Sequence, residues 1–136
     1  FVRPFLDGVP ALELIDASGT RTAVDGQWRK PLVLLVDGGT RSGKEMLARS
    51  LQRSGRAVVV GVRTAGAVLG GRIFPLPDGS LLYLATHDVL VDGERLEGVG
   101  VEPEIVVEDR LLHAAGSDPQ RRKAIATAAE AVQRKR

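Results

Sequence analysis

Cysteine is missing from this 136-residue chain, and aromatic side chains make up only 4% of it. Without cysteine the protein cannot form disulfides, thiolate metal sites or a thiol nucleophile. Histidine is scarce as well, because His87 and His113 are the only two, and two are too few for a histidine metal cluster. The sequence therefore predicts neither a metal site nor a bound cofactor.

A strong charge imbalance and long apolar runs are also absent. The formal net charge is +2, and with so few aromatic residues it gives no support for nucleic-acid binding. No apolar run is long enough to span a membrane, and no signal peptide is present. Because the chain begins with Phe1 and not with Met, we expect a piece of a longer protein, and the missing targeting signals then leave the compartment open.

The most informative stretch of the chain is KPLVLLVDGGTRSGKEMLARSLQRS. Its residues 32–36 form an unbroken apolar run, which predicts a buried strand covered on both faces. Gly38 and Gly39 then allow the positive φ or the close backbone approach of a sharp turn. Apolar residues at helical spacing follow and predict an amphipathic helix that starts near Ser42 and ends at Gly55.

Ser42 thus lies where unpaired N–H groups and the positive end of a helix dipole converge, a place that favours anions such as the oxyanion of acyl transfer. Three interpretations are open. Ser42 caps the helix, with Glu45 completing a capping box. Residues 38–44 form a phosphate-binding loop, G-x-x-x-x-G-K, although Glu45 replaces the hydroxyl that would hold Mg²⁺. In the third interpretation Ser42 is a nucleophile.

The rest of the chain predicts a single α/β domain. Residues 57–62 form a second buried strand, so that strand, helix and strand make a parallel crossover. The loop 63–71 after it is rich in small residues, which indicates either a ligand crevice or a flexible turn. Three hairpins are predicted, pairing 11–15 with 20–24, 72–76 with 81–86, and 88–91 with 94–96.

A short strand at 105–107 and a terminal helix that opens at Pro119 complete the prediction. Trp28 is expected to pack on the central strand as part of the core. The terminal helix is expected to bury a narrow apolar stripe, which consists of Ala124, Ile125, Ala128, Ala129 and Val132.

Five segments, taken in order, are similar to those of one protein family: DGGTRSGKEMLARSLQ, GRAVVVGVRTAGA, PLPDGSLLYLAT, LEGVGVEPEIVV and DPQRRKAI. From about Pro31 to the terminal helix the chain resembles the catalytic half of the carboxyl-terminal processing (tail-specific) serine peptidases of family S41. The resemblance implies a ClpP/crotonase-like core of β-β-α units with flanking β-hairpins and a C-terminal helix. It implies that residues 1–136 are the C-terminal part of this domain, and that the PDZ domain and the N-terminal half of the core lie outside the chain.

The same resemblance assigns roles to individual residues. Ser42 becomes the nucleophile, and Gly43 contributes its backbone N–H to the oxyanion hole. Thr64 and Gly66 match the Thr-x-Gly segment of the family and are expected to contact the substrate. In the processing-protease branch a lysine base follows that segment directly, but this chain has Ala67 there.

Three explanations for the missing base stay open. The chain is similar to the tricorn-like branch, in which the base is a histidine; it would lie upstream of this chain, and Glu97 matches the acidic residue of that branch. Alternatively, Lys44 is the base, although two residues after the serine on a new helix it projects away from the hydroxyl. In the third explanation Ala67 marks a loss of the base, and the chain is a catalytically inactive peptide-binding or assembly module.

A local triad of Ser42, His87 and Asp88 is the weaker alternative, since the family does not require a histidine at that position, and we expect His87 to be a surface or structural residue. The family supplies a second oxyanion donor and a substrate-gating PDZ domain from upstream sequence. We therefore expect the 136-residue chain to fold but to hydrolyse peptides poorly. Its expected partner is a protein or peptide substrate, in the cell envelope or after export, and a homo-oligomer is left open.

Overall fold

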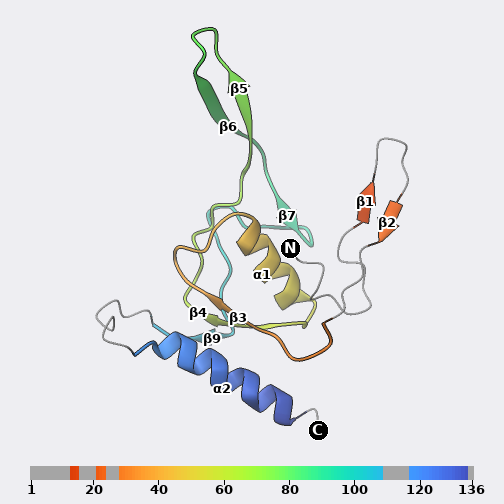
Figure 1. Ribbon diagram of the computed structural model, residues 1–136, viewed down its shortest axis with the longest axis vertical. Coiled ribbons are helices and arrows are strands. Elements are labelled where there is room, and N and C mark those ends of the chain that lie inside the picture. Colours follow the sequence, from red (N-terminus) through yellow and green to blue (C-terminus); the bar gives the residue numbers. More distant parts are fainter. Residues whose placement is uncertain (1–12, 16–20, 24–27, 109–116, 135–136) are drawn as a thin grey trace.

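The computed structural model describes residues 13–15, 21–23, 28–108 and 117–134. The elements in chain order are β1 (Glu13–Ile15), β2 (Arg21–Ala23), β3 (Val33–Val36), α1 (Gly43–Arg53), β4 (Val58–Gly61), β5 (Gly70–Pro75), β6 (Leu81–His87), β7 (Leu90–Val91), β8 (Glu94–Arg95), β9 (Ile105–Val106) and α2 (Pro119–Gln133). Figure 1 shows α1 on one side of a small sheet and α2 on the other, with the β5–β6 hairpin extending away from this body. The predicted α/β class is confirmed.

The central sheet is parallel and has the order β3–β4–β9. Leu34 lies opposite Val59, and Gly61 lies opposite Val106. Since α1 connects β3 to the adjacent parallel strand β4, the predicted strand–helix–strand unit is confirmed. Val59 and Val60 in β4 are both 0% exposed, as expected for the middle strand of a sheet covered by helices.

The prediction that residues 32–36 are covered on both faces is wrong. Only Val36 is buried in β3, and Leu35 is 46% exposed. The reason is position, because β3 is an edge strand of the three-stranded sheet and β4 lies between the helices. An apolar run predicted the strand, but its place in the sheet decided its burial.

The core lies where α1 packs on β4 and on the segment that follows β8. Its centre is a cluster of small and branched side chains, and a second cluster around Leu51 and Ala57 extends it toward the amino end of β4. The first cluster comprises Val36, Ala48, Val59, Val68, Val91, Leu96 and Val101. Helix and loop residues are therefore held in one packed unit.

α2 begins as predicted, with Asp118 as its N-cap accepting from the N–H of Arg121 (2.8 Å) and with proline in its first turn. The predicted apolar stripe is correct only at Ala124 and Ala128, which are half-buried, since Ile125 is 59% and Val132 is 45% exposed and Ala129 is exposed as well. The half-buried positions include Ala124, Thr127, Ala128 and Ala131, and the helix packs on β3 and β4. Neither helix in the described part of the chain is long and apolar enough to cross a membrane.

Trp28 also departs from its predicted core position. It is 43% exposed, and the Lys30 ammonium lies 5.8 Å from the centre of its ring. This is cation–π geometry at the surface. The negative face of the ring therefore attracts a neighbouring cation at the surface, and the ring does not fill the core.

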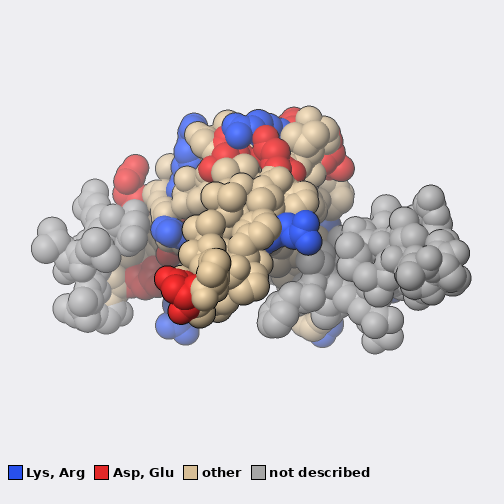
Figure 2. All heavy atoms as spheres, turned by 90° about the horizontal axis from the view of Figure 1, so that it is seen from above, with Lys and Arg blue, Asp and Glu red and all other residues tan. Residues whose placement is uncertain are grey.

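The three predicted hairpins are confirmed as the pairs β1–β2, β5–β6 and β7–β8. The predicted first turn, residues 16–19, lies outside the described residues. The turn between β5 and β6 is closed by a bond from the Leu76 N–H to the Ser80 carbonyl (2.9 Å), and Gly79 has a φ of +84°. Seen from above, this hairpin projects toward the reader as a largely uncharged column (Figure 2).

Candidate active site

A hydrogen-bonded turn carries the chain from the end of β3 to the serine. The Asp37 carboxylate accepts from the Gly39 N–H (3.0 Å) and from the Thr40 hydroxyl (2.9 Å), and the Thr40 N–H donates to the Asp37 carbonyl (3.0 Å). Neither Gly38 nor Gly39 has a positive φ, and the close neighbour of Gly39 is the side chain of Asp37. The predicted positive φ is therefore wrong for both glycines, and the close approach is found only at Gly39, where a Cβ would lie 3.3 Å from the Asp37 carboxylate that organises the turn.

Ser42 itself carries the backbone strain, with φ +61° and ψ −135°. Holding a residue other than glycine in such a region costs about 1–3 kcal/mol, and such strain clusters at functional sites. A nucleophilic serine on a sharp strand-to-helix turn has this arrangement, since the turn exposes its hydroxyl. Ser42 is exposed, and its N–H is fixed by the Ala67 carbonyl (2.8 Å) and by Glu45 Oε2 (3.1 Å).

α1 starts one residue after the serine, as the sequence predicted. The Ser42 carbonyl accepts from the N–H of Glu45 (2.8 Å) and of Met46 (3.3 Å), which closes the first turn. Gly43 is the first helical residue, so its N–H has no acceptor within the helix and lies at the positive end of the dipole. The oxyanion-hole role expected of this N–H stays a prediction.

Glu45 connects the serine turn to the loop that follows β4. The Glu45 half of the predicted capping box is formed, since Oε2 accepts from the Ser42 N–H, but the Glu45 side chain is 0% exposed and does more than cap. Its carboxylate also accepts from the Thr64 hydroxyl, the Gly66 N–H (2.7 Å) and the Ala67 N–H (2.9 Å). Within residues 38–44 the N–H groups of Gly39, Thr40 and Ser42 already have acceptors in the protein, which removes support from the phosphate-loop interpretation.

The carboxylate of Glu45 is stabilised in its charged form. Burial raises its pKa, but the hydrogen bonds from Thr64, Ala67, Gly66 and Ser42 together outweigh burial, and the pKa ends below its usual value. Donor groups, not a cation, hold this charge within the described residues. Glu45 is therefore an ionised anchor between the helix and the loop.

Thr64 and Gly66 were predicted to contact substrate, but both contact the backbone of residues 98–101. Thr64 is buried; its hydroxyl accepts from the Val101 N–H (2.7 Å), and its own N–H donates to the Val101 carbonyl (3.1 Å). Gly66 has a φ of +68°, and a Cβ there would lie 2.9 Å from the backbone nitrogens of Val99 and Gly100. The small residues of this loop thus allow the backbone of residues 98–100 to approach closely.

Ala67 lies beside the serine, because its carbonyl accepts from the Ser42 N–H. The position at which the resemblance expects a lysine is therefore next to the candidate nucleophile, and the residue there is exposed. No described histidine, lysine or carboxylate forms a hydrogen bond with the Ser42 hydroxyl. The site has a serine and a donor from Gly43, but no base within the described residues.

The other predicted catalytic residues are Glu97 and Lys44. Among the described residues, neither forms a hydrogen bond with the Ser42 hydroxyl. Glu97 Oε2 accepts from the N–H of Val68 (2.7 Å) and of Leu69 (3.1 Å), so it fixes the end of the loop. Lys44 is exposed, and the described residues give it no hydrogen bond or ion pair. Glu97 thus acts on the loop beside Ala67, and Lys44 has the solvated position expected from its place on the helix.

A local triad with His87 is not assembled. His87 Nδ1 lies 2.8 Å from the Thr86 hydroxyl at the end of β6. The Asp88 carboxylate accepts from Arg95 Nε (2.5 Å) and from the Val89 N–H (2.9 Å). In the described part of the chain His87 therefore has the surface role that the sequence predicted.

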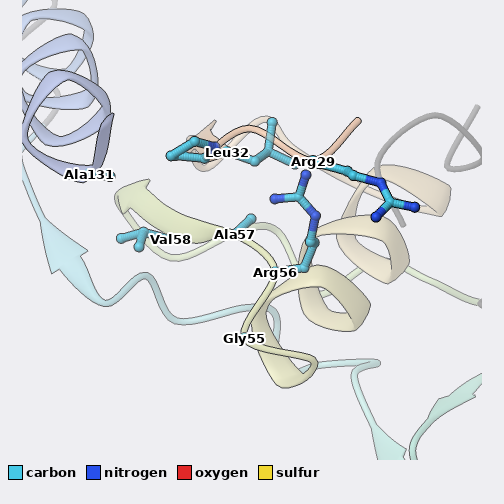
Figure 3. Close-up of a pocket in the computed structure, with 8 residues that line it drawn as sticks. Arg29, Leu32, Gly55, Arg56, Ala57, Val58 and Ala131 are labelled. Carbon is cyan, nitrogen blue, oxygen red and sulfur yellow. The ribbon is translucent and has the colours of Figure 1, made fainter. Parts of the chain in front are cut away.

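A cavity of about 220 Å³ lies at the opposite end of the sheet from the serine. It is lined by residues at the amino ends of β3 and β4 and by Ala131 of α2, and the Arg56 side chain extends toward the segment that carries Arg29 (Figure 3). Arg56 donates to the backbone carbonyls of Trp28 and Lys30. No predicted site residue lines this cavity, and no group of three potential metal ligands occurs among the residues described.

Sequence reasoning missed the wider role of Glu45. The signal was available, because Glu45, Ala48 and Leu51 follow one another at intervals of three and form the buried face of α1. A carboxylate on the buried face of a helix requires donors from another segment. The helical period could thus have identified Glu45 as an anchor, although not its partners.

Comparison with known proteins agrees with this geometry. The model of peptidase family S41 matches residues 8–107. The carboxyl-terminal-processing protease of a Picosynechococcus strain is 50% identical over 79 residues, which cover 57% of this chain and 19% of that protein. Tricorn protease homolog 1 of Streptomyces coelicolor is 34% identical over 109 residues, which cover 77% of this chain and 10% of that protein.

A solved photosystem II D1 C-terminal processing protease has a similar fold, with a TM-score of 0.62 and 27% identity. The match covers 93% of this chain and 33% of that one, so the chain corresponds to a part of its relatives. The predicted fold and family resemblance are both confirmed. Since the family model spans most of the residues that build the serine turn, the loop and the sheet, the chain belongs to peptidase family S41.

Proposed function

We propose that the protein is a serine-type endopeptidase of the carboxyl-terminal processing or tricorn-like kind, with Ser42 as its nucleophile. The observation that carries the proposal is the backbone of Ser42, an exposed serine held at φ +61° at the start of a helix. Strain of this kind persists only where surrounding bonds fix it, and here the Ala67 carbonyl and Glu45 do so.

In this mechanism the Ser42 hydroxyl oxygen attacks the carbonyl carbon of the scissile peptide bond while a base accepts the hydroxyl proton. The N–H of Gly43 donates to the oxyanion that forms, and the dipole of α1 adds positive potential there. Expulsion of the amine, which takes up the proton, leaves an acyl group on Ser42. Water then attacks the ester, releases the new carboxyl end of the substrate and restores the hydroxyl.

The base comes from outside the described residues. Position 67 is adjacent to the serine but holds alanine, and Glu97 bonds to the loop next to it. We assign Glu97 a supporting role, which is to hold the Val68–Leu69 end of this loop in place. Because the chain spans 10–19% of the two relatives described, a base and a second oxyanion donor from flanking sequence fit the proposal. Residues 1–136 then act as the C-terminal part of the catalytic domain.

Labelling by a fluorophosphonate, which modifies activated serines, tests the proposal. We expect mass spectrometry to find the label on Ser42 in a longer polypeptide that includes the flanking sequence, and little label on the 136-residue chain. Ser42→Ala is the control that abolishes the signal. A folded longer protein that stays unlabelled would contradict the proposal.

Ala67→Lys provides a second test. A lysine beside Ser42 supplies a base where the processing-protease branch has one, so we expect this variant of the 136-residue chain to react faster with the fluorophosphonate. Lys44→Ala is the matched control, because Lys44 is exposed on the helix and its loss should leave the labelling rate unchanged. Labelling that depends on Lys44 would instead identify it as the base.

The alternative function is a catalytically inactive peptide-binding or assembly module. It is favoured by one observation, the alanine at position 67 together with the lack of a base bonded to Ser42 among the described residues. In that case the longer polypeptide would not react with the fluorophosphonate, and Ser42→Ala would bind peptides as well as the unmodified protein does.

A further inference from the structure

The cavity at the amino ends of β3 and β4 has a composition that the serine chemistry does not explain. Its wall is mostly apolar and is formed by the two strand ends and α2, including Leu32, Ala57, Val58 and Ala131. Arginines supply its charge, and no acidic residue is among the described residues that line it. Small-molecule sites have this composition, an apolar wall with a few polar groups that fix the orientation of a ligand.

Arg56 is the charged group of the wall whose bonding is incomplete. Its Nη2 donates to the backbone carbonyls of Trp28 and Lys30, and the side chain extends toward the segment that carries Arg29 (Figure 3). Its Nε is buried and has no hydrogen-bond partner among the described residues, and no described group accepts from Nη1. A guanidinium group has five N–H donors, so Arg56 keeps donors for a further acceptor.

The carboxylates that flank the cavity in the sequence are already engaged. Glu104 Oε2 accepts from the N–H of Val59, the residue after Val58 (2.7 Å), and Glu130, next to Ala131, pairs with Arg134 (3.8 Å). An anion in the cavity would therefore meet positive potential without a competing carboxylate from its described lining. Charge complementarity thus selects an anionic ligand.

The size of the cavity limits the ligand. Its volume is about 220 Å³, whereas an engineered apolar cavity of about 150 Å³ holds benzene. By this scale the site has room for about eight non-hydrogen atoms. A doubly charged phosphate would lose more hydration in an apolar wall than a carboxylate does. A carboxylate with a short aliphatic chain therefore fits the volume, the wall and the charge together.

We propose that this cavity is a binding site for an aliphatic carboxylate, whose head group accepts from Arg56 and whose chain packs on Leu32, Val58 and Ala131. The site goes beyond the proposed peptidase function and does not depend on Ser42. A charge-assisted hydrogen bond to the guanidinium supplies orientation, and burial of the chain supplies affinity. The same chemistry occurs in a free short-chain acid and at the carboxyl end of a peptide with an aliphatic last residue.

The position of the cavity predicts an effect on stability. Its wall joins α2 to the strand ends, because Ala131 belongs to the helix and Leu32 and Val58 lie where β3 and β4 begin. A ligand that binds only the folded state raises the midpoint of thermal unfolding. We therefore expect hexanoate to stabilise the protein against heat in proportion to its binding.

Isothermal titration calorimetry of the 136-residue chain with hexanoate tests the proposal. Acetate, which lacks the chain, and hexan-1-ol, which lacks the charge, should each bind at least tenfold more weakly. Arg56→Gln should weaken hexanoate binding at least tenfold. Arg122→Gln, which removes an exposed arginine near the other end of α2, should change it less than twofold. Equal binding of hexanoate and hexan-1-ol, or insensitivity to Arg56→Gln, would overturn the proposal.

A second variant blocks the cavity without touching its charge, because Arg56 also holds the segment of Trp28 and Lys30. Ala131→Leu places extra carbon atoms inside the cavity and should abolish hexanoate binding in a protein that keeps its circular dichroism spectrum. Ala126→Leu is the matched control, since Ala126 is an exposed position on the same helix. Binding that survives Ala131→Leu would place the ligand elsewhere and contradict the proposal.

Methyl NMR spectra locate the ligand without any variant. During a hexanoate titration the methyl signals of Leu32, Val58 and Ala131 should shift together. Those of Val68 and Val101, in the core cluster that contacts α1, should stay unchanged. Shifts confined to other residues would overturn the assignment of the cavity.

The two sources of the carboxylate are separated by the peptide Ala-Ala-Val-Leu with a free or an amidated carboxyl end. Tighter binding of the free peptide than of hexanoate, lost on amidation, supports a chain end as the ligand, whereas binding of hexanoate alone supports a free acid. The same titration is made on the longer polypeptide with its flanking sequence. If that protein binds neither ligand, flanking sequence covers the cavity and the proposal fails.

Discussion

The loop of residues 64–69 and the hairpin that follows it are adjacent in sequence but are stabilised in opposite ways. Two carboxylates, Glu45 and Glu97, accept from four successive N–H groups of the loop, Gly66 to Leu69. The hairpin has its own cross-strand pairs, and every residue from Arg72 to His87 is exposed. The loop is therefore fixed by side chains from other segments, whereas the hairpin is stabilised mainly by pairing between its own two strands.

This difference separates two requirements of the proposed function. The position of Ser42 must be fixed to within a fraction of an ångström, because misplacement of a nucleophile is costly. A surface that receives an extended peptide must instead be open and must keep free backbone groups. The chain meets the first requirement with buried hydrogen bonds and the second with an exposed sheet edge.

Removing the carboxylate of Glu45 should have the largest effect. We expect Glu45→Ala to lower the free energy of unfolding by about 3–5 kcal/mol, because several buried donors lose their acceptor at about 1–3 kcal/mol each. Urea denaturation at pH 7, followed by circular dichroism, measures the change. Glu94→Ala is the control, since Glu94 forms half-exposed ion pairs with Arg49 and Arg53 and should cost less than about 1 kcal/mol.

If Glu45→Ala and Glu94→Ala lower the free energy of unfolding equally, the buried hydrogen bonds of Glu45 do not determine how the serine turn is held. A loss of fluorophosphonate labelling in Glu45→Gln without a change in stability would show that the carboxylate positions Ser42 but contributes little to folding.

Two glycines with positive φ allow a direct comparison of the loop with the hairpin. Gly66 in the loop has φ +68°, and its Cβ would meet backbone at 2.9 Å, whereas Gly79 in the hairpin turn has φ +84° and open space around it. We expect Gly66→Ala to cost about 3 kcal/mol or more, since strain and overpacking add. Gly79→Ala should cost about 1–2 kcal/mol from the left-handed conformation alone. Similar values in thermal denaturation would show that the loop moves to accommodate the methyl group.

The pH dependence of stability should be the third effect in size. The folded-state pKa of Glu45 is lowered, so its contribution is present above the unfolded-state value of 4.5 and is lost as the pH falls through the lower folded-state pKa. The loss is smaller than in Glu45→Ala because the neutral acid keeps its oxygens as acceptors. Urea denaturation between pH 6 and pH 3 should show a steeper fall for the unmodified protein than for Glu45→Gln. Parallel curves would contradict the lowered pKa.

The smallest changes in stability should come from exposed side chains of the β5–β6 hairpin. We expect Ile73→Ser to alter the free energy of unfolding by less than about 0.5 kcal/mol, because the side chain is exposed. Tyr83→Ser should cost about 1 kcal/mol, because the ring also packs over Gly71. Val59→Ala in β4, where the side chain is 0% exposed, should cost about 2 kcal/mol and is the buried control. A loss of several kcal/mol in the free energy of unfolding for Ile73→Ser or Tyr83→Ser would mean that the hairpin packs against another part of the protein.

Local patterns in the sequence predicted much of the fold. An apolar run, a helical period and paired turn signals located β3, α1, β4 and the hairpins, and they placed Ser42 at the start of α1. The capping partnership of Ser42 and Glu45 was also predictable, because its two residues are three apart. Features of this kind depend on neighbours within one turn of helix or one hairpin.

The candidate site was predicted less completely. The turn before Ser42 was attributed to glycine conformations, whereas the Asp37 side chain forms it and the positive φ belongs to the serine. Glu97 was expected to take part in catalysis, and its bonds to Val68 and Leu69 assign it to the loop, while its catalytic role stays a prediction. The base was not found in the sequence, and the described residues do not supply one.

By itself the sequence determined the order of strands and helices, the place of the serine and the buried face of α1. The tertiary structure alone decided that Glu45 would meet a loop about 20 residues away and that Glu97 would meet the same loop from 29 residues downstream. It also decided that β3 would be an edge and that the hairpin would be exposed. The physical reason is that side-chain periodicity is fixed locally, whereas partners and burial depend on how distant segments pack together.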